Sequence, residues 1–418
     1  MIHKKRLNKV LLALSIAFTA SQVNAAGFQL NAQSATGLGR AFAGDAVIAD
    51  NASVASRNAA AMALFDSTAL STGFNVLITD IKVSNGTYKS PFIAGGEAPS
   101  DYDNAGGTSV APNFHLIVPL NDKFAVGMSL YSNFATRTEF DNSFVGAEYG
   151  GLTDVKSMNL GLLASYRINK QWSIGGGLDI IYGKGKLQRH LSSKLPANSP
   201  VGPLKGKEVL NADTAGFGLG FNLGTVFELD KNNRFGLSYH YSPKLHTKGD
   251  IFYNDVMAKD DTLYMAIPDM AEFSGYHRLT DSKFAVHYSV QWIGWSSFKS
   301  LDSKAHGTIK EYQWKDTYHL SLGTTYYLNN DWTLRAGYMY DASAQDEVTS
   351  ISVPDSNRQW FSAGFTYQLN ENSNVDFGAT YLLGKDVQVT ESTPPLSSIA
   401  ATTHANAILM AMQYSYKF

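Results

Sequence analysis

Apolar and polar residues alternate along most of the chain after residue 66. Three runs show the pattern clearly: 158–167, 172–182 and 408–418. In each run, the residues on one face are mostly large and apolar, and those on the other face are mostly small or polar. A period of two is typical of β-strands, and an apolar face opposite a small or polar one is typical of strands that contact lipid. The pattern predicts an all-β protein whose strands cross a membrane.

A short motif recurs between these runs and predicts the number of strands. Each copy has an aromatic residue or a proline, a polar turn with Asn or Asp, and an aromatic residue that opens the next run. The six copies begin at Pro119, Tyr166, Phe227, Tyr276, Tyr326 and Tyr367. A barrel of n strands with both ends in the periplasm has n/2 − 1 short turns, so six turns predict a 14-stranded antiparallel transmembrane β-barrel over residues 67–418. Seven longer stretches are available as outer loops, near 84–109, 138–155, 185–213, 244–272, 297–315, 342–358 and 385–404.

Residues 26–66 lack the alternation and are rich in Ala, Gly, Ser and Asn. A barrel of this size encloses a lumen that side chains of the wall do not fill. We therefore expect this segment to be a plug, or hatch, inside the barrel. Residues 1–25 differ again, because four basic residues precede a short apolar run, 10–20, and Val23-Asn24-Ala25 fits a small-x-small cleavage site. This pattern predicts a secretory signal peptide, and the apolar run is too short to cross a bilayer.

Composition and charge narrow the possible functions. The chain has no cysteine, which excludes disulfides and thiol chemistry. The formal net charge of −2 becomes about −6 without the four basic residues of the signal peptide, which argues against a nucleic-acid partner. The ten histidines are scattered without metal-ligand spacing, so we predict no metal and no other cofactor. An exported chain with many aromatic residues and no long apolar run indicates the outer membrane of a Gram-negative bacterium.

Two of the predicted outer loops differ in chemistry. The fourth, near 244–272, is apolar, and the third, near 185–213, is basic. Exposed apolar side chains are costly unless they form a binding surface or pack against neighbouring loops, and both alternatives stay open. The cations either attract the phosphates of lipopolysaccharide or meet the head group of an anionic ligand. Among the apolar residues of the fourth loop we expect ligand contacts from Val256, Met257, Leu263, Met265 and Ile267.

Several long motifs resemble the outer-membrane long-chain fatty acid transporters of the FadL family. These motifs include AGFQL at 26–30, GLGRAFAGDAVIAD at 37–50, MALFD at 62–66, PNFHLIVPLNDKF at 112–124 and IPDMAEFSGYHR at 267–278. The resemblance covers essentially the whole mature chain and implies a 14-stranded barrel with a plug. It implies that ligand is caught between the third and fourth outer loops and then moves to a pocket inside the barrel. By this resemblance Phe28 contacts the ligand, and Arg189 and Lys310 face its carboxylate, which arginine can bind in a bidentate manner.

The resemblance also implies that ligand leaves sideways, through a gap made by a kinked third strand, here 124–140. The family usually carries a glycine at the kink, whereas this chain has Ala135, which bends less readily. Asp341 matches an acidic residue near the gap. In the hatch, the family's Asn-Pro-Ala is replaced by Asn58-Ala59-Ala60, which removes a rigid turn and favours a helical or looser segment.

These observations predict passive uptake of long-chain fatty acids or similar hydrophobic compounds by a monomeric barrel that is not an enzyme. The expected partners are the hydrophobic ligand, outer-membrane lipids and lipopolysaccharide, with no nucleic acid. One alternative is an uptake channel for neutral aromatic hydrocarbons, which related members carry, and another is a structural or adhesive barrel or a general porin. A lipid hydrolase would need a Ser-His-Asp or Ser-His-Asn group, and nothing in the sequence brings such residues together.

Overall fold

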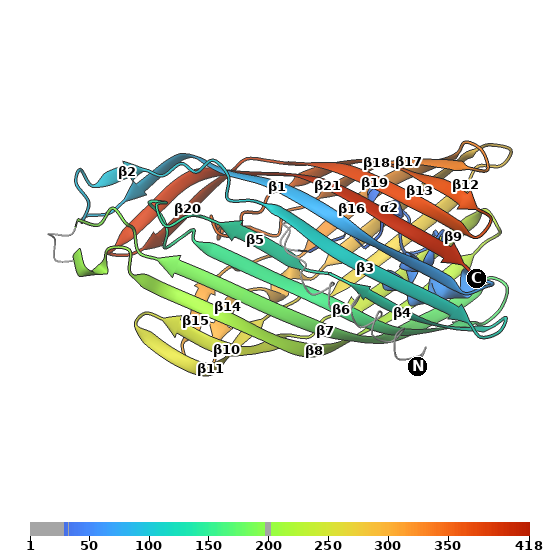
Figure 1. Ribbon diagram of the computed structural model, residues 1–418, viewed down its shortest axis with the longest axis horizontal. Coiled ribbons are helices and arrows are strands. Elements are labelled where there is room, and N and C mark those ends of the chain that lie inside the picture. Colours follow the sequence, from blue (N-terminus) through green and yellow to red (C-terminus); the bar gives the residue numbers. More distant parts are fainter. Residues whose placement is uncertain (1–28, 32, 197–201) are drawn as a thin grey trace, which may run out of the picture.

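The computed structural model describes residues 29–31, 33–196 and 202–418 (Figure 1). The predicted signal peptide and Phe28 lie outside the described residues. The wall is a closed antiparallel barrel of 14 strands, which confirms the count from the turns, and pairing of β1 with β21 closes it. In chain order the wall strands are β1 (Ala69–Lys89), β3 (Thr108–Pro119), the interrupted pair β4 and β5 (Phe124–Tyr131 and Ala135–Glu139), β6 (Leu152–Arg167), β7 (Trp172–His190), β8 (Glu208–Glu228), the pair β9 and β10 (Asn233–Tyr241 and Leu245–Tyr253), the pair β11 and β12 (Val256–Met265 and Met270–Arg278), β13 (Phe284–Ile293), β16 (Thr317–Tyr327), β17 (Trp332–Asp341), β18 (Arg358–Asn370), β19 (Ser373–Gly384) and β21 (Ser397–Lys417).

The two ends of the barrel differ in their connections. The short turns and the C-terminus lie at one end, called here the turn end, and the long connections lie at the other, the loop end (Figure 1). Four short strands lie in the loop-end connections: β2 (Glu97–Pro99), β14 (Ser300–Ser303), β15 (Gly307–Glu311) and β20 (Val387–Thr393). A three-residue 3-10 helix occurs in two of these connections, η4 (Gly202–Leu204) and η5 (Trp295–Ser297).

The expectation of an outer loop over 244–272 is wrong in one respect. Most of this stretch is a β-hairpin, because β10 and β11 pair with each other and β10 also pairs with β8 from Lys248 to Tyr253. The hairpin thus extends the wall beyond the part that contacts lipid, which is the part that needs an apolar outer face. The inward face of the hairpin is apolar and buried, at Leu245, Ile251 and Leu263, whereas its outward face carries polar residues. It therefore lacks the large apolar outer residues that were used to find the other strands.

The short turns share a local hydrogen-bond pattern that explains the sequence repeat. The side chains of Asn121, Asn169 and Asn329 accept hydrogen bonds from the backbone N–H groups two and three residues later. The Asp230 carboxylate makes the same pair of contacts. Such side chains satisfy backbone donors that a tight turn leaves without strand partners. The third residue after each of these three asparagines is the aromatic residue that opens the next strand.

Aromatic rings form cross-strand pairs on the outer face at the turn end. Their ring centroids lie 4.6–4.8 Å apart in the pairs Phe124–Tyr166, Trp172–Phe227, Phe284–Tyr326 and Trp332–Tyr367. Paired aromatic residues at the level of the membrane interface are typical of transmembrane barrels. Nearer the middle of the wall, exposed Leu178 alternates with buried Asp179, as the sequence pattern predicts.

The segment from Ser34 to Leu64 lies inside the barrel, toward the turn end (Figure 1). It contains α2 (Ala35–Leu38) and the 3-10 helices η2 (Ala52–Ser56) and η3 (Ala59–Leu64). Each helix begins with a side-chain cap, which satisfies N–H groups that such short helices leave free. Within the described part of the chain, no helix combines the length and apolar character needed to cross a membrane.

Glycines in the wall allow this segment to approach closely. A Cβ atom at Gly175 in β7 would lie 2.4 Å from the backbone nitrogen of Ala60. A Cβ atom at Gly378 in β19 would lie 2.3 Å from the carbonyl oxygen of Ala35. The helices therefore rest directly on the backbone of the wall, where only glycine leaves room.

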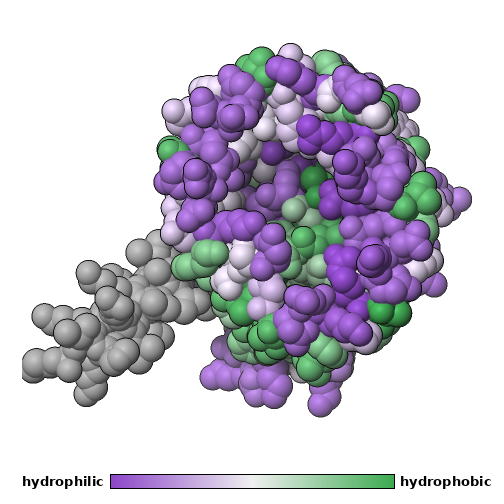
Figure 2. Space-filling view, turned by 90° about the vertical axis from the view of Figure 1, so that its right-hand side faces the viewer, coloured by the Kyte–Doolittle hydropathy of each residue, from purple (hydrophilic) through white to green (hydrophobic). Residues whose placement is uncertain are grey.

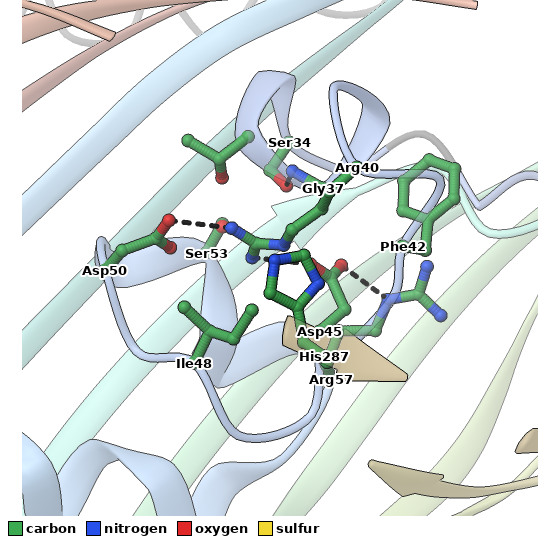
Figure 3. Close-up of polar contacts among 12 residues, drawn as sticks. Ser34, Gly37, Arg40, Phe42, Asp45, Ile48, Asp50, Ser53, Arg57 and His287 are labelled. Carbon is green, nitrogen blue, oxygen red and sulfur yellow. Dashed lines mark hydrogen bonds and ion pairs between the residues drawn. The ribbon is translucent and has the colours of Figure 1, made fainter. Parts of the chain in front are cut away.

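Ion pairs join the segment to itself (Figure 3) and to the wall; their arginines are buried, and Asp50 is partly exposed. Arg40 contacts Asp45 at 2.8 Å and Asp50 at 2.7 Å, and Arg57 lies 3.4 Å from Asp45. Two more pairs reach wall residues, Arg57–Glu272 at 3.5 Å and Arg335–Asp50 at 3.3 Å. Breaking a buried pair leaves an uncompensated charge, so this network favours one seated position of the segment.

The turn end of the barrel is hollowed (Figure 2). The hollow corresponds to a cavity of about 320 Å³. Its lining includes Asp50 and Phe65 from the inner segment and Lys417 from β21. The inner segment thus forms part of the floor of this opening.

Candidate ligand-binding site

A second cavity, of about 620 Å³, lies toward the loop end. Its lining includes residues of β7, β8, β14, β15 and β20, of the connections between β5 and β6 and between β17 and β18, and of the turn of the β10–β11 hairpin. Apolar residues such as Leu187 and Ile309 share this lining with Arg189, Lys310 and Glu391. A mainly apolar wall with a few charged groups suits a ligand that has both an apolar and a charged part.

The Arg189 side chain is buried at the edge of this cavity. Its Nη1 donates to the carbonyl oxygens of Leu152 (2.6 Å) and Gln188 (2.8 Å), and its Nη2 donates to the hydroxyl of Thr153 (2.7 Å). All three acceptors are neutral, and within the described part of the chain Arg189 forms no ion pair. Burial lowers the pKa of Arg189, and the charge of Glu391 opposes this shift. Arg189 is thus a buried cation that a nearby carboxylate compensates only through space, without a hydrogen bond, which favours a second anion beside it.

Lys310 lies in β15 and lines the same cavity. Its Nζ donates to Glu391 at 2.6 Å, to the hydroxyl of Ser350 at 2.8 Å and to that of Ser352 at 3.3 Å. Burial lowers the pKa of Lys310; the charge of Glu391 opposes this shift, and that of Arg189 adds to it. The two cations are thus close enough for their charges to interact, and the structure brings together the basic residues that the sequence resemblance assigns.

An aromatic cluster adjoins the charged groups. Tyr312 lines the cavity, with the Nζ of Lys310 lying 5.6 Å from the centre of its ring, and burial raises the pKa of its hydroxyl to about 12. Its ring lies 4.7 Å from Phe298, which in turn lies 4.9 Å from Trp314. Three of the predicted ligand residues are buried in the same apolar cluster, Leu263, Met265 and Ile267. Tyr312 thus connects the charged groups of the cavity with a buried aromatic and aliphatic cluster beside it.

The predicted ligand residues of the fourth loop fall into an exposed group and a buried group in the structure. Val256 and Met257 are more than half exposed, at 57% and 54%, near the tip of the β10–β11 hairpin. Leu263 is buried, and none of these three residues lines the loop-end cavity. The expected ligand contacts of these residues stay a prediction: Val256 and Met257 are exposed beside the hairpin turn, and Leu263 is buried in the apolar cluster.

The third wall strand is interrupted between Tyr131 and Ala135. Before the break, β4 pairs with β3; after it, β5 pairs with β6. The carbonyl oxygen of Asn133 accepts a hydrogen bond from the N–H of Leu30 (2.6 Å), and Phe134 forms a bridge with Gln29. The start of the described hatch segment therefore contacts the wall at its break, and Ala135 begins β5 there without a glycine.

Asp341 is fully buried in β17. Its carboxylate lies 3.0 Å from Nε2 of His319 and accepts a hydrogen bond from the indole nitrogen of Trp360 (3.2 Å). His319 is 2.9 Å from the side chain of Asn31. Asp341 thus reaches the hatch through His319, and its direct partners lie in the wall strands beside it rather than at the break in the third strand.

The residues Asn58, Ala59 and Ala60 form the start of η3. The Asn58 side chain accepts a hydrogen bond from the N–H of Ala60 (3.1 Å) and donates to the carbonyl oxygens of Ala46 (3.0 Å) and Thr225 (3.1 Å). Without the proline, Asn58 caps a 3-10 helix and ties it to β8. Of the two options left open by the sequence, the segment is helical.

Sequence reasoning missed Glu391 and the aromatic residues Phe298, Tyr312 and Trp314. Glu391 lies about 80 positions from Lys310, and a single glutamate in a polar stretch carries no local signal. The aromatic residues fall within 297–315, and clustered aromatic residues in a polar connection are the one sign that could have found them.

The closed wall, the segment folded inside it and the cavity at the loop end define an outer-membrane barrel of the transport class. A family model matches residues 16–418, and the chain belongs to this family, described as outer membrane protein transport protein (OMPP1/FadL/TodX).

Similar proteins are found in several Gram-negative bacteria. The chain is 35% identical to a long-chain fatty acid transport protein of Salmonella typhi and 34% identical to outer membrane protein P1 of Haemophilus influenzae. These alignments cover 100% and 99% of this chain and all of each relative. Among solved structures, a Pseudomonas aeruginosa FadL homologue has a TM-score of 0.83 at 24% identity, covering 94% of this chain and 100% of the homologue. The similarity to this solved structure supports the fold.

Proposed function

We propose that the protein takes up long-chain fatty acids, or similar amphiphiles with one acidic end, across the outer membrane by passive transport. The observation that carries this proposal is the buried Arg189 beside Lys310, next to an aromatic and aliphatic cluster; the hydrogen-bond acceptors of Arg189 are all neutral. An apolar chain fits the cluster, and a carboxylate offsets the charge of the arginine. Relatives that cover the whole chain are named long-chain fatty acid transport proteins, which supports the same ligand class.

In this proposal, residues 1–25 are removed on export, 26–66 close the lumen and 67–418 form the transmembrane barrel. The Val256–Met257 tip catches ligand, Phe28 contacts it in the lumen, and release is sideways at the break near Ala135. Contacts that link the site to this break support lateral release: Thr138 of β5 donates to the carbonyl oxygen of Ser352, whose hydroxyl accepts from Lys310. The barrel acts as a monomer among outer-membrane lipids and lipopolysaccharide, and it performs no catalysis.

Binding by the purified protein tests the role of Arg189. Replacing Arg189 with Gln removes the charge, and loss of charge-assisted hydrogen bonding should weaken oleate binding by about 10- to 150-fold. The exposed Lys205, in the same basic stretch but outside the cavity lining, provides the control Lys205→Gln, which should bind oleate as the wild type does. In a strain that lacks its own fatty acid transporter, growth on oleate should follow the same order.

Neutral aromatic hydrocarbons are a second candidate ligand class, favoured by the ring cluster of Phe298, Tyr312 and Trp314. A solved structure of a Ralstonia pickettii toluene transporter has a TM-score of 0.65 at 16% identity, covering 93% of this chain and 99% of that one, so the fold accommodates both classes. The fatty acid proposal would be replaced by this one if the protein bound toluene but not oleate, and if the Arg189→Gln variant bound ligand as the wild type does.

A further inference from the structure

Glu391 occupies the place at Lys310 where an incoming carboxylate would bind. It lies in β20, lines the cavity, and places one carboxylate oxygen 2.6 Å from Nζ of Lys310. The other oxygen accepts a hydrogen bond from the backbone N–H of Ile351, also at 2.6 Å. The side chain is only 11% exposed, so both oxygens are held in a defined position.

The ammonium group of Lys310 has no free donor for a ligand. A lysine ammonium carries three N–H donors, and Lys310 has three acceptors, namely Glu391, Ser350 and Ser352. A carboxylate that binds Lys310 must therefore replace one of them. Glu391 has the same chemistry as such a ligand, whereas the two hydroxyls are neutral and can remain.

The cations in the cavity lining differ in what compensates them. Lys207 pairs with Asp255 at 2.6 Å and Lys310 pairs with Glu391 at 2.6 Å, and both pairs line the cavity. Within the described residues, Arg189 is the lining cation without an ion-pair partner. Two further acids line the cavity but do not pair with these cations: Glu311 bonds to Gln313, and Glu148, whose pKa is raised by burial, bonds to Tyr88 and Ser397.

We propose that Glu391 is a resident counter-carboxylate that competes with the head group of the ligand and selects for a single negative charge. The inference rests on the proposed function, because it concerns the same site. In the empty protein Glu391 pairs with Lys310 and acts on Arg189 only through its charge, so the guanidinium is the cation left for the carboxylate of one ligand. The negative charge of Glu391 repels the carboxylate of the ligand. This repulsion limits the affinity for the ligand and lets bound ligand leave. A head group with two negative charges meets the same repulsion twice.

The Glu391→Gln variant tests this competition. The amide oxygen can still accept from Ile351, but the negative charge is gone. In the full-length protein in lipid nanodiscs, the dissociation constant for oleate should fall by about tenfold, because one unit charge beside the site is removed. The dissociation constant for oleyl alcohol, which has the same chain and no charge, should stay within about twofold of the wild-type value.

Two further variants separate charge from structure. Glu97→Gln removes a negative charge from the exposed strand β2, outside the cavity lining, and should leave oleate binding unchanged. Glu391→Asp keeps the charge, and should bind oleate as the wild type does. Retention of the heat-dependent gel shift of folded barrels checks that each variant is intact.

Three outcomes would overturn the inference: unchanged or weaker oleate binding by folded Glu391→Gln, equal tightening for oleate and oleyl alcohol, or tightening by Glu391→Asp. Weaker binding of both ligands by Glu391→Gln would instead identify Glu391 as a purely structural tie between β20 and Ile351. Failure of the wild type to bind or take up oleate would refute the proposed function itself. If the wild type binds oleate and Glu391→Gln binds it with the same dissociation constant, only this inference is refuted.

Discussion

Replacing Gly175 with Ala should unseat the hatch segment from the wall. The added Cβ would lie 2.4 Å from the nitrogen of Ala60 and 2.6 Å from the carbonyl carbon of Ala59, whereas ordinary contacts begin at 3.4 Å. The backbone of η3 must therefore retreat by about 1 Å, and overpacking of this kind costs about 1–3 kcal/mol. If this cost destabilises the state in which the hatch segment contacts the wall, the fraction of molecules in which the segment has left the wall rises by roughly 5- to 150-fold.

Conductance in planar lipid bilayers measures this effect. The wild type should show little steady conductance if residues 26–66 close the lumen, and Gly175→Ala should show more frequent or longer open events. Gly161→Ala is the matched control, because its Cβ would meet the side-chain oxygen of Asp179 at 3.1 Å and not the hatch backbone. Equal conductance of the two folded variants would refute the reasoning. Gly378→Ala, which would crowd Ala35, should reproduce the effect at the other side of the segment.

Two further predictions concern capture and release. The double variant Val256→Ser, Met257→Ser should slow the initial rate of oleate uptake several-fold without changing thermal stability, because both side chains are already exposed; an unchanged rate at low oleate concentration would remove the hairpin tip from the capture step. Ala135→Gly should raise the rate of uptake by at most about fivefold, because glycine weakens a strand by about 0.5–1 kcal/mol at the break. A fall in uptake by this variant would show that a firm start of β5 is needed for transport.

Much of the fold could be predicted because its signals are local. Each turn needs a side-chain acceptor such as Asn121 or Asn169, and each outer face needs apolar residues, so the turns and the alternation appear directly in the sequence. The β10–β11 hairpin could not be predicted in this way. Its outer face lies beyond the lipid and carries charged residues such as Lys248 and Asp260 in place of apolar ones, and its pairing with β8 is decided by contacts distant in the sequence.

The site was predicted only in part. Arg189 and Lys310 came from the resemblance to a family, and the structure brings both to one cavity. Glu391 could not be found, because its role depends on which loops meet above the barrel. Ligand contacts were expected from both Val256 and Leu263, since sequence proximity does not show that one is exposed and the other buried.

The length of the wall strands sets where the loop-end cavity stands above the membrane. β1, β8 and β21 each contain 21 residues. At about 3.3 Å per residue and a tilt of about 40°, such strands rise roughly 50 Å, twice the height of the apolar band of about 25 Å. The cavity with Arg189 and Lys310, at the loop end, therefore lies above the apolar band rather than within it. Under the proposed function, a hydrophobic molecule arriving from outside meets the protein before it meets the acyl chains.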